Sequence, residues 1–317
     1  MTETIRDAYG RKLKELGKKY PEIVVLDADV SGSTKSAIFG KEFPERFYNC
    51  GIAESAMIGM AAGMAASEKI PFVNTFAVFM ATIGSMGARL YLSYSGLNVK
   101  LVGAYGGLSD SYDGATHQSL EDIGVMRALP GMITMVASDA RVAEWMTEEA
   151  VKYPGPMYLR MSRDVFPTCH KEEQIYEIGK GIVLREGNDA AIIACGLMVS
   201  QAMKAAEELE QEGISVRVID MFTIKPLDEE LILKTACETG AVVTAEEHSI
   251  YGGLGSAVAE TLVKNEVSVP TEMIGMKDCH GESGSYQELL HKYSLDKEAL
   301  MKAVKTVTER KRQKEIS

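Results

Sequence analysis

A dense group of polar residues at positions 113–122 is the part of the sequence whose residue types point most directly to chemistry. It reads Asp-Gly-Ala-Thr-His-Gln-Ser-Leu-Glu-Asp and follows a glycine-containing stretch at 103–108. Polar side chains this closely spaced after an apolar run are typical of a ligand-binding loop, although Asp113-Gly114 alone is also a common turn signal. The neutral imidazole of His117 is suited to hydrogen bonding and proton transfer near neutral pH.

A second candidate is a carboxylate at the start of an apolar helix. Glu54 follows Cys50-Gly51-Ile52-Ala53, and residues 56–65 are all apolar or glycine. A helix without a polar face must be buried, either in a core or against a partner, so we expect Glu54 to be held in apolar surroundings. The simpler explanation for an acid at a helix N-terminus is its favourable interaction with the helix dipole.

Alternating strands and helices are expected to position these segments. This alternation predicts an α/β fold with a parallel sheet, in which loops after the carboxyl ends of strands form the ligand site. Asp29 and Ser33 follow the first strand, and Arg163 follows the last strand of the first half. The expected strands are 23–26, 71–76, 99–103, 133–136 and 157–160, and the expected helices are 5–19, 52–67, 84–94 and 140–152.

The alternation is interrupted near residue 168 and then resumes with strands at 190–194, 216–220 and 241–245. We therefore predict two domains, residues 1–168 and a smaller α/β domain at residues 175–317. In the second domain, Gly252-Gly253-x-Gly255 lacks the full dinucleotide-binding spacing. Asp278-Cys279-His280 makes a poor metal site. His248 is expected to be structural, and His170 and His291 are expected on the surface.

Composition excludes several classes of function. The 317 residues carry a formal net charge of −11, which argues against a nucleic-acid surface. The longest uncharged apolar helix, at 55–67, is too short to span a bilayer, and no apolar export signal is visible. The five cysteines lack C-x-x-C spacing and indicate reduced thiols. We expect a cytoplasmic protein that acts on small molecules.

These motifs resemble the transketolase family of thiamine-diphosphate enzymes, and the resemblance covers nearly the whole chain as a pyrimidine-binding domain followed by a transketolase C-terminal domain. Gly-Ile-Ala-Glu54 resembles the segment whose acid holds N1′ of the coenzyme's aminopyrimidine. Thr-Phe-Ala-Val-Phe79 resembles the segment whose aromatic ring stacks on that pyrimidine, with Phe76 in the core. In Asp-Gly-Ala-Thr-His-Gln, the resemblance implies that Asp113 binds a sugar hydroxyl and that His117 contacts the substrate near the reacting carbon.

The resemblance also implies roles for residues at the substrate's tail. Arg163 is similar to a family arginine that grips the sugar phosphate, Asp29 and Ser33 are similar to positions near the thiazolium and the tail, and Arg6 could make a second phosphate contact. Many transketolases carry a further phosphate-binding histidine before the Asp-Gly motif. The stretch 103–108 has no histidine, which leaves the donor's tail, phosphorylated or not, open.

The half of the family enzyme that grips the diphosphate is absent from the sequence. No Gly-Asp-Gly, the family's Mg²⁺-binding motif, occurs in the chain. The resemblance thus implies a split enzyme, in which an N-terminal subunit holds Mg²⁺ and the diphosphate, thiamine diphosphate binds between the chains, and two copies of each form a dimer of heterodimers. The expected reaction transfers a two-carbon ketol unit from a ketose, or ketose phosphate, to an aldose. The alternatives are a beta-type subunit of a 2-oxo-acid dehydrogenase, a deoxyxylulose-phosphate synthase, or a non-catalytic scaffold.

Overall fold

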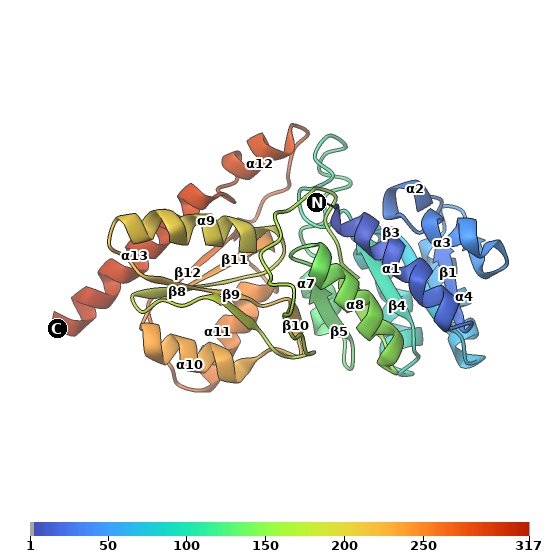
Figure 1. Cartoon of the computed structure of the whole chain (residues 1–317), viewed down its shortest axis with the longest axis horizontal. Helices are drawn as coiled ribbons and strands as arrows, with labels where there is room; N and C mark the ends of the chain where they lie inside the picture. Colours follow the sequence, from blue (N-terminus) through green and yellow to red (C-terminus); the bar gives the residue numbers. More distant parts are fainter. Residues whose placement is uncertain (1–2, 317) are drawn as a thin grey trace.

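Two sheets, one of seven strands and one of five, form the centres of the two halves of the molecule (Figure 1). The computed structural model describes residues 3–316. Each sheet is covered by helices on both faces, so the predicted two-domain α/β fold is confirmed. Within the described residues, every helix is too short or too polar to cross a membrane.

The first sheet has the strand order β10-β5-β6-β4-β3-β1-β2, and all neighbouring strands are parallel except β10 and β5. Its central strands are buried along their whole length, which explains why they read as continuous apolar runs. The strands are β1 (Ile23–Asp27), β2 (Phe47–Asn49), β3 (Ile70–Phe76), β4 (Lys100–Ala104), β5 (Ile133–Val136), β6 (Met157–Arg160) and β10 (Thr223–Lys225).

Helices α1 (Ile5–Lys19) and α8 (Ala140–Lys152) lie side by side on one face of this sheet (Figure 1). Both begin at a side-chain cap, since Thr4 accepts a hydrogen bond from the Asp7 backbone and Asp139 accepts one from Val142. Helices α4 (Glu54–Ala66) and α7 (Asp122–Ala128) contribute to the opposite face. The shorter helical segments are α2 (Ser31–Thr34), α3 (Ala37–Glu42), α5 (Ala77–Thr82) and a 3₁₀ turn (Pro44–Arg46).

The helix expected at residues 84–94 is irregular. It consists of α6 (Ser85–Gly87) and a π-helical turn (Ala88–Ser93). This segment packs closely on α4, because a Cβ atom on Gly84 or Gly87 would lie 2.7 or 3.0 Å from the Ile58 side chain. The close approach requires glycine at both positions. Helical periodicity in the sequence does not reveal this requirement.

The second sheet has the order β12-β11-β8-β9-β7, with β7 antiparallel to β9. The three strands expected from the sequence are its central strands, and the two edge strands were missed. Its strands are β7 (Ile182–Arg185), β8 (Ala190–Ala194), β9 (Val216–Asp220), β11 (Val242–Ser249) and β12 (Thr271–Met276). Its helices are α9 (Leu197–Gln211), α10 (Glu229–Thr239), α11 (Leu254–Lys264), α12 (Tyr286–Lys292) and α13 (Lys297–Ile316).

Strand β10 joins the two halves. It follows β9 in the chain but pairs with β5 of the first sheet, and Lys225 at its end donates to the carbonyls of Arg127 (2.9 Å) and Leu129 (2.5 Å). One apolar core also continues from α1 to α13. The two halves are therefore packed into one body, and the division at residues 1–168 and 175–317 stays a prediction.

Candidate active site

Six of the eight predicted site residues lie in segments that follow the carboxyl ends of neighbouring parallel strands, while Arg6 lies in α1 and Glu54 in α4. Strands β6, β4, β3 and β1 are consecutive in the first sheet, so the loops that follow them meet at one edge. The segments after these strands carry Asp29 and Ser33 (in α2) after β1, Phe79 (in α5) after β3, Asp113 and His117 after β4, and Arg163 after β6.

An aromatic cluster connects two of these loops. The His117 ring meets Phe79 edge-on, with centroids 5.3 Å apart, and lies 6.1 Å from Phe76. Phe76 also lies 4.6 Å from the ring of Tyr105. Phe76 is buried, as expected, whereas Phe79 is partly exposed. The Phe79 ring and the His117 imidazole are therefore close enough to contact one bound molecule.

Glu54 is the first residue of α4 and its side chain is buried. Its Oε1 accepts a hydrogen bond from the Thr75 hydroxyl at 3.2 Å. Thr75 lies in β3 next to Phe76, so this bond ties the Glu54 carboxylate to the end of the strand that carries the aromatic cluster. The arrangement can hold a ring nitrogen of a ligand whose face stacks on an aromatic side chain.

A buried acid shapes the loop after β1. Asp27 accepts hydrogen bonds from the Val30 backbone (2.7 Å) and the Thr34 hydroxyl (2.8 Å), and burial raises the pKa of its carboxyl. Asp29 has a φ of +66° and is exposed, with its Oδ1 bonded to Nδ2 of Asn49 at 2.8 Å. Neither Asp27 nor Asn49 was predicted as a site residue. The partners of Asp27 lie in the loop that follows it, whereas Asn49 reaches Asp29 from the neighbouring strand β2.

The two predicted arginines differ in their surroundings. Arg6 is buried, and its guanidinium donates to the Tyr105 hydroxyl (3.1 Å), to the Arg163 carbonyl (3.2 Å) and to the Ser33 carbonyl. Both guanidinium groups pack over the Tyr105 ring, at 4.7 Å for Arg6 and 5.3 Å for Arg163. Arg163 forms an ion pair with Asp110, in which Nη1 and Oδ1 are 3.4 Å apart. Arg6 therefore ties α1 to the loops of the site, while Arg163 retains an exposed part.

Asp110 lies with Asp113 in the loop after β4. Burial, followed by the nearby charge of Asp113, raises the pKa of Asp110 to about 6, while His117 and Arg163 act in the opposite direction. Asp110 and Tyr105 were not among the predicted site residues. The sequence feature that could have indicated them is their position in the same loop as the Asp-Gly-Ala-Thr-His-Gln motif.

Residues of the C-terminal domain stabilise the loop after β4. Glu247 of β11 accepts hydrogen bonds from the Leu108 backbone (2.6 Å) and the Tyr286 hydroxyl (2.9 Å). Burial raises the pKa of Glu247 to about 7. Gly107 has a φ of +72°, and a Cβ atom there would lie 2.3 Å from the carboxyl carbon of Glu247. A glycine is thus required where the loop crosses Glu247.

An ion pair fixes the other end of the loop. Nε of Arg160 lies 2.7 Å from Oδ2 of Asp122, and both residues are buried. Nη2 of Arg160 donates to the carbonyls of Ser119 (3.2 Å) and Glu247 (2.9 Å). One guanidinium therefore connects the end of the loop to the C-terminal domain.

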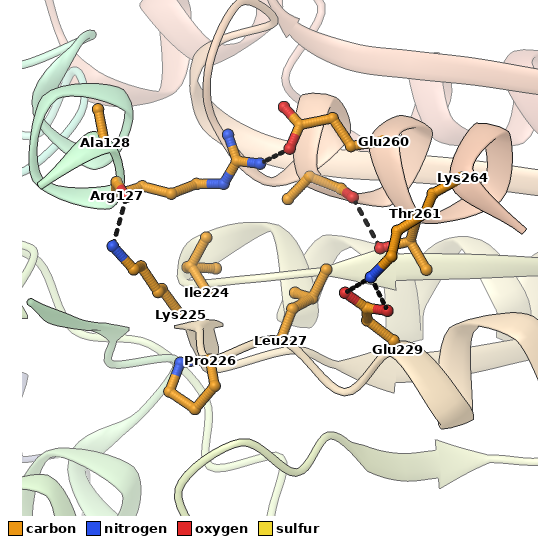
Figure 2. A pocket seen from close by; sticks show the side chains of 11 residues that line it. Arg127, Ala128, Ile224, Lys225, Pro226, Leu227, Glu229, Glu260, Thr261 and Lys264 are labelled. Atoms are coloured by element: carbon orange, nitrogen blue, oxygen red, sulfur yellow. Dashed lines mark hydrogen bonds and ion pairs between the residues drawn. The ribbon is translucent and has the colours of Figure 1, made fainter. Parts of the chain in front are cut away.

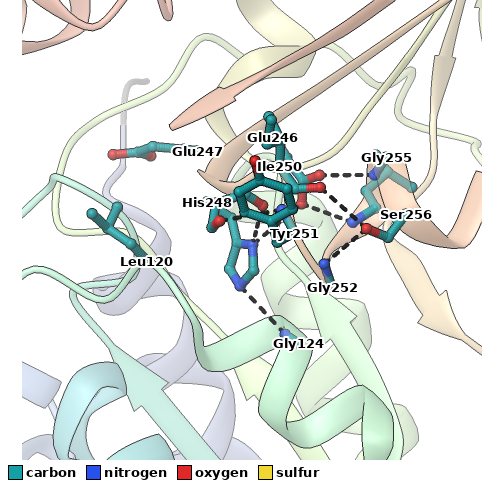
Figure 3. A network of polar contacts seen from close by, with 12 residues as sticks. Leu120, Gly124, Glu246, Glu247, His248, Ile250, Tyr251, Gly252, Gly255 and Ser256 are labelled. Carbon is teal, nitrogen blue, oxygen red and sulfur yellow. Dashed lines mark hydrogen bonds and ion pairs between the residues drawn. The ribbon is translucent and has the colours of Figure 1, made fainter. Parts of the chain in front are cut away.

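The glycine-rich segment of the second domain has a structural role. Glu246 accepts hydrogen bonds from the backbones of Leu254 and Gly255, both at 2.7 Å, so a protein carboxylate occupies the N-terminus of α11 (Figure 3). Nε2 of His248 accepts from the Gly124 backbone at 3.3 Å (Figure 3). His248 is buried between the domains, as expected for a structural residue.

The expected surface position of His170 was wrong. Its ring is buried and its Nε2 lies 2.8 Å from Oδ2 of Asp220, which also accepts from the Ser138 hydroxyl at 2.5 Å. The linker that carries His170 folds into the joint between the domains, which local composition cannot indicate. His291 is exposed, as expected.

A separate cavity of about 630 Å³ lies between α7, β10 and α11 (Figure 2). Its cationic side chains contact protein acceptors: Arg127 pairs with Glu260, and Lys264 pairs with Glu229 at 3.1 Å. Lys225 is bonded to backbone carbonyls. The predicted site residues do not line this cavity, so it is not the candidate active site.

Comparison with known proteins identifies the class to which this fold and site belong. Residues 2–168 match the pyrimidine-binding domain of transketolases, and residues 179–300 match the transketolase C-terminal domain. The chain belongs to the transketolase family. The predicted resemblance is confirmed for both domains.

The relatives indicate which part of a transketolase the chain represents. A solved structure described as a split gene transketolase, inactive beta4 tetramer, is 44% identical, with a TM-score of 0.88 over 98% of this chain and 99% of that one. The 6-deoxy-6-sulfo-D-fructose transketolase subunit SqwH of Clostridium sp. (strain MSTE9) is 41% identical over 97% of this chain and 95% of its own. Human transketolase is 35% identical over 95% of this chain but only 48% of its own length. The chain thus corresponds to the C-terminal half of a single-chain transketolase.

Proposed function

We propose that the chain is the C-terminal subunit of a split transketolase, which transfers a two-carbon ketol unit from a ketose to an aldose. Two contacts near the carboxyl end of β3 carry the proposal, the hydrogen bond between Thr75 and Glu54 and the ring contact between Phe79 and His117, in a chain that matches half of the family enzyme. The acidic balance of the chain favours small substrates over nucleic acid, and we place the complex in the cytoplasm.

The family implies thiamine diphosphate as the coenzyme, and the residues present fit its pyrimidine half. Glu54 supplies a buried carboxylate that can hold a ring nitrogen, and Phe79 supplies a partly exposed aromatic ring on which the pyrimidine can stack. The diphosphate half has no equivalent support, since residues 3–316 contain no group of three His, Cys, Asp or Glu able to hold a metal. We therefore assign Mg²⁺ and the diphosphate to an N-terminal partner subunit.

When bound, the coenzyme supplies the electron sink for breaking and forming the carbon–carbon bond. In our proposal, the Glu54 carboxyl holds a proton at the pyrimidine N1′, and Phe79 orients the ring. His117 hydrogen bonds with the substrate oxygen next to the reacting carbon and moves a proton there. Asp113 binds a sugar hydroxyl, and Arg163 contacts the tail with Ser33 nearby. Asp29 lies on the thiazolium side, and Arg6 supports the tail site through its bonds to these loops.

An exposed apolar surface supports the need for a partner. Around the start of α4 and the π-helical turn, Ile52, Met86 and Tyr94 are 84%, 72% and 89% exposed, and Met60 and Tyr91 are also exposed. We call these five residues the α4 apolar surface. Because Glu54 begins the same helix, a subunit packed on this surface would lie next to the pyrimidine site. We propose that this contact, with self-association, gives a dimer of heterodimers.

The proposal is tested by ketol transfer with the two subunits mixed. We expect transfer only in the mixture, and we expect Glu54→Gln to lower kcat by about 10²–10⁴-fold without loss of complex formation. Glu68→Gln, a change of an exposed acid just beyond the other end of α4, is the matched control and should retain activity. Turnover by this chain alone, or full activity of Glu54→Gln, would contradict the proposal. Activity confined to a 2-oxo acid would instead favour the dehydrogenase alternative.

A further inference from the structure

A carboxylate on the arginine side of the site has no part in the function proposed so far. Asp110 is 1% exposed, and its Oδ1 lies 3.4 Å from Nη1 of Arg163. Its Oδ2 is buried and has no hydrogen-bond partner among the described residues. We propose that Asp110 selects the charge of the substrate's tail, so that neutral or singly charged tails are favoured over a doubly charged phosphate. This inference rests on the proposed ketol-transfer function.

Arg163 is the cation available to a tail at this place. The guanidinium of Arg6 is buried, and its Nε, Nη1 and Nη2 each donate to protein oxygens. The Arg163 side chain is 39% exposed. An anionic tail would therefore contact one partly exposed guanidinium that already faces a carboxylate. Much of the positive charge of Arg163 is thus balanced by Asp110 before the substrate binds.

The position of Asp110 is fixed on both sides by its neighbours. The Ser109 hydroxyl donates to the Gly106 carbonyl (2.8 Å) and accepts from the Arg163 backbone (3.2 Å). On the other side, the Gly284 backbone donates to the Ser111 carbonyl at 3.0 Å. Asp110 is therefore held beside Arg163 and cannot easily turn away when a second negative charge approaches.

The other charged groups near Asp110 do not cancel its repulsion of a doubly charged tail. Asp113 and His117 face Asp110 from its own loop, and Arg163 faces it from the loop after β6. Asp164, next in the chain, interacts with the charges of both arginines. The ring between those arginines is the uncharged phenol of Tyr105. The negative charges of the acids in this site already balance the positive charges of the arginines. A second negative charge on the tail should therefore lower the affinity for the substrate by about tenfold or more.

Protonation of Asp110 should relieve this repulsion. Burial and the Asp113 charge raise the pKa of Asp110 to about 6, so acidification from pH 8 to pH 6 makes the acid partly neutral. A phosphate ester also changes its own charge in this range, because its second pKa is about 6. A sulfonate keeps one negative charge throughout, so a comparison of the two tails separates the protein's titration from that of the substrate.

The test measures kcat/KM of the reconstituted complex with D-fructose, 6-deoxy-6-sulfo-D-fructose and D-fructose 6-phosphate as donors. We expect Asp110→Asn to raise kcat/KM for the phosphate donor at pH 8 by about tenfold, for the sulfonate donor by less, and for D-fructose by less than twofold. Asp164→Asn removes a nearby acid that, among residues 3–316, forms no ion pair with Arg163, and it should change kcat/KM for the phosphate donor by less than threefold. Equal effects of Asp110→Asn on all three donors would overturn the proposal.

A second measurement does not depend on turnover. Inorganic phosphate is titrated into this chain, and we expect Asp110→Asn to bind it about tenfold more tightly than wild type at pH 8, with the difference shrinking towards pH 6. Equal or weaker binding by Asp110→Asn would overturn the role of Asp110. Tighter phosphate binding without ketol transfer from any donor would keep the charge-selection proposal and reject the proposed function.

Discussion

Glu247→Gln is the change that tests most sharply how the C-terminal domain supports the site. Glu247 is 2% exposed and accepts hydrogen bonds from the Leu108 backbone and the Tyr286 hydroxyl. Glutamine has the same shape and stays neutral. Its oxygen can accept from Leu108 and its amide can donate to the Tyr286 oxygen, since a phenol hydroxyl can donate or accept. The substitution therefore mimics the protonated form of Glu247.

The pH dependence follows from the raised pKa of Glu247. The value is about 7 in the folded chain against an ordinary value of 4.5, so the folded state binds this proton more tightly than the unfolded state. The stability from this group is fully present below about pH 4.5 and is lost as the pH rises through about 7. The difference between the two pKa values corresponds to about 3 kcal/mol.

The measurement is the free energy of unfolding in urea at pH 4.5 and pH 8.5. Glu247→Gln should gain about 2–3 kcal/mol relative to wild type between the two pH values, and this double difference cancels any constant effect of the amide. Glu173→Gln, at an exposed linker acid, is the control and should show no such gain. A constant difference between Glu247→Gln and wild type at both pH values would refute the reasoning.

Two further predictions concern the same loop and the partner surface. Gly107→Ala should destabilise the chain by about 2–4 kcal/mol in urea unfolding, because the new Cβ atom would overlap Glu247. The control is Gly131→Ala, at a glycine with a similar positive φ and open space around it, which should cost about 1 kcal/mol. An equal loss of stability in both variants would contradict the steric argument. Met86→Glu, on the α4 apolar surface, should weaken association with the N-terminal subunit at least tenfold without lowering the melting temperature. Val263→Glu, at an exposed apolar residue of α11, is the control and should leave this association unchanged. Equal binding by both variants would exclude the α4 apolar surface from the interface.

Much of the fold could be predicted because the central strands are buried on both faces. Strands β1 and β8 read as short apolar runs between polar turns. Strands β2 and β10 have three residues each, and the pairing of β10 with the first sheet depends on contacts more than 80 positions apart. Local patterns contain no information about such a pairing.

The candidate site was predictable where its residues form short motifs. Glu54, Phe79 and His117 belong to contiguous segments, and parallel strand order brings those segments together. Glu247 and Asp110 were missed, because burial and long-range contacts determine their role. Glu247 in particular reaches the loop from the other domain, and its importance emerges only when the two domains are packed.

The central claim is that this chain holds the pyrimidine end of a coenzyme whose diphosphate end is held by another subunit. Isothermal titration of thiamine diphosphate with Mg²⁺ into this chain, into the N-terminal subunit and into their mixture tests it directly. We expect tight binding by the mixture and binding at least a hundredfold weaker by this chain alone. Equally tight, Mg²⁺-dependent binding by this chain alone would contradict the account.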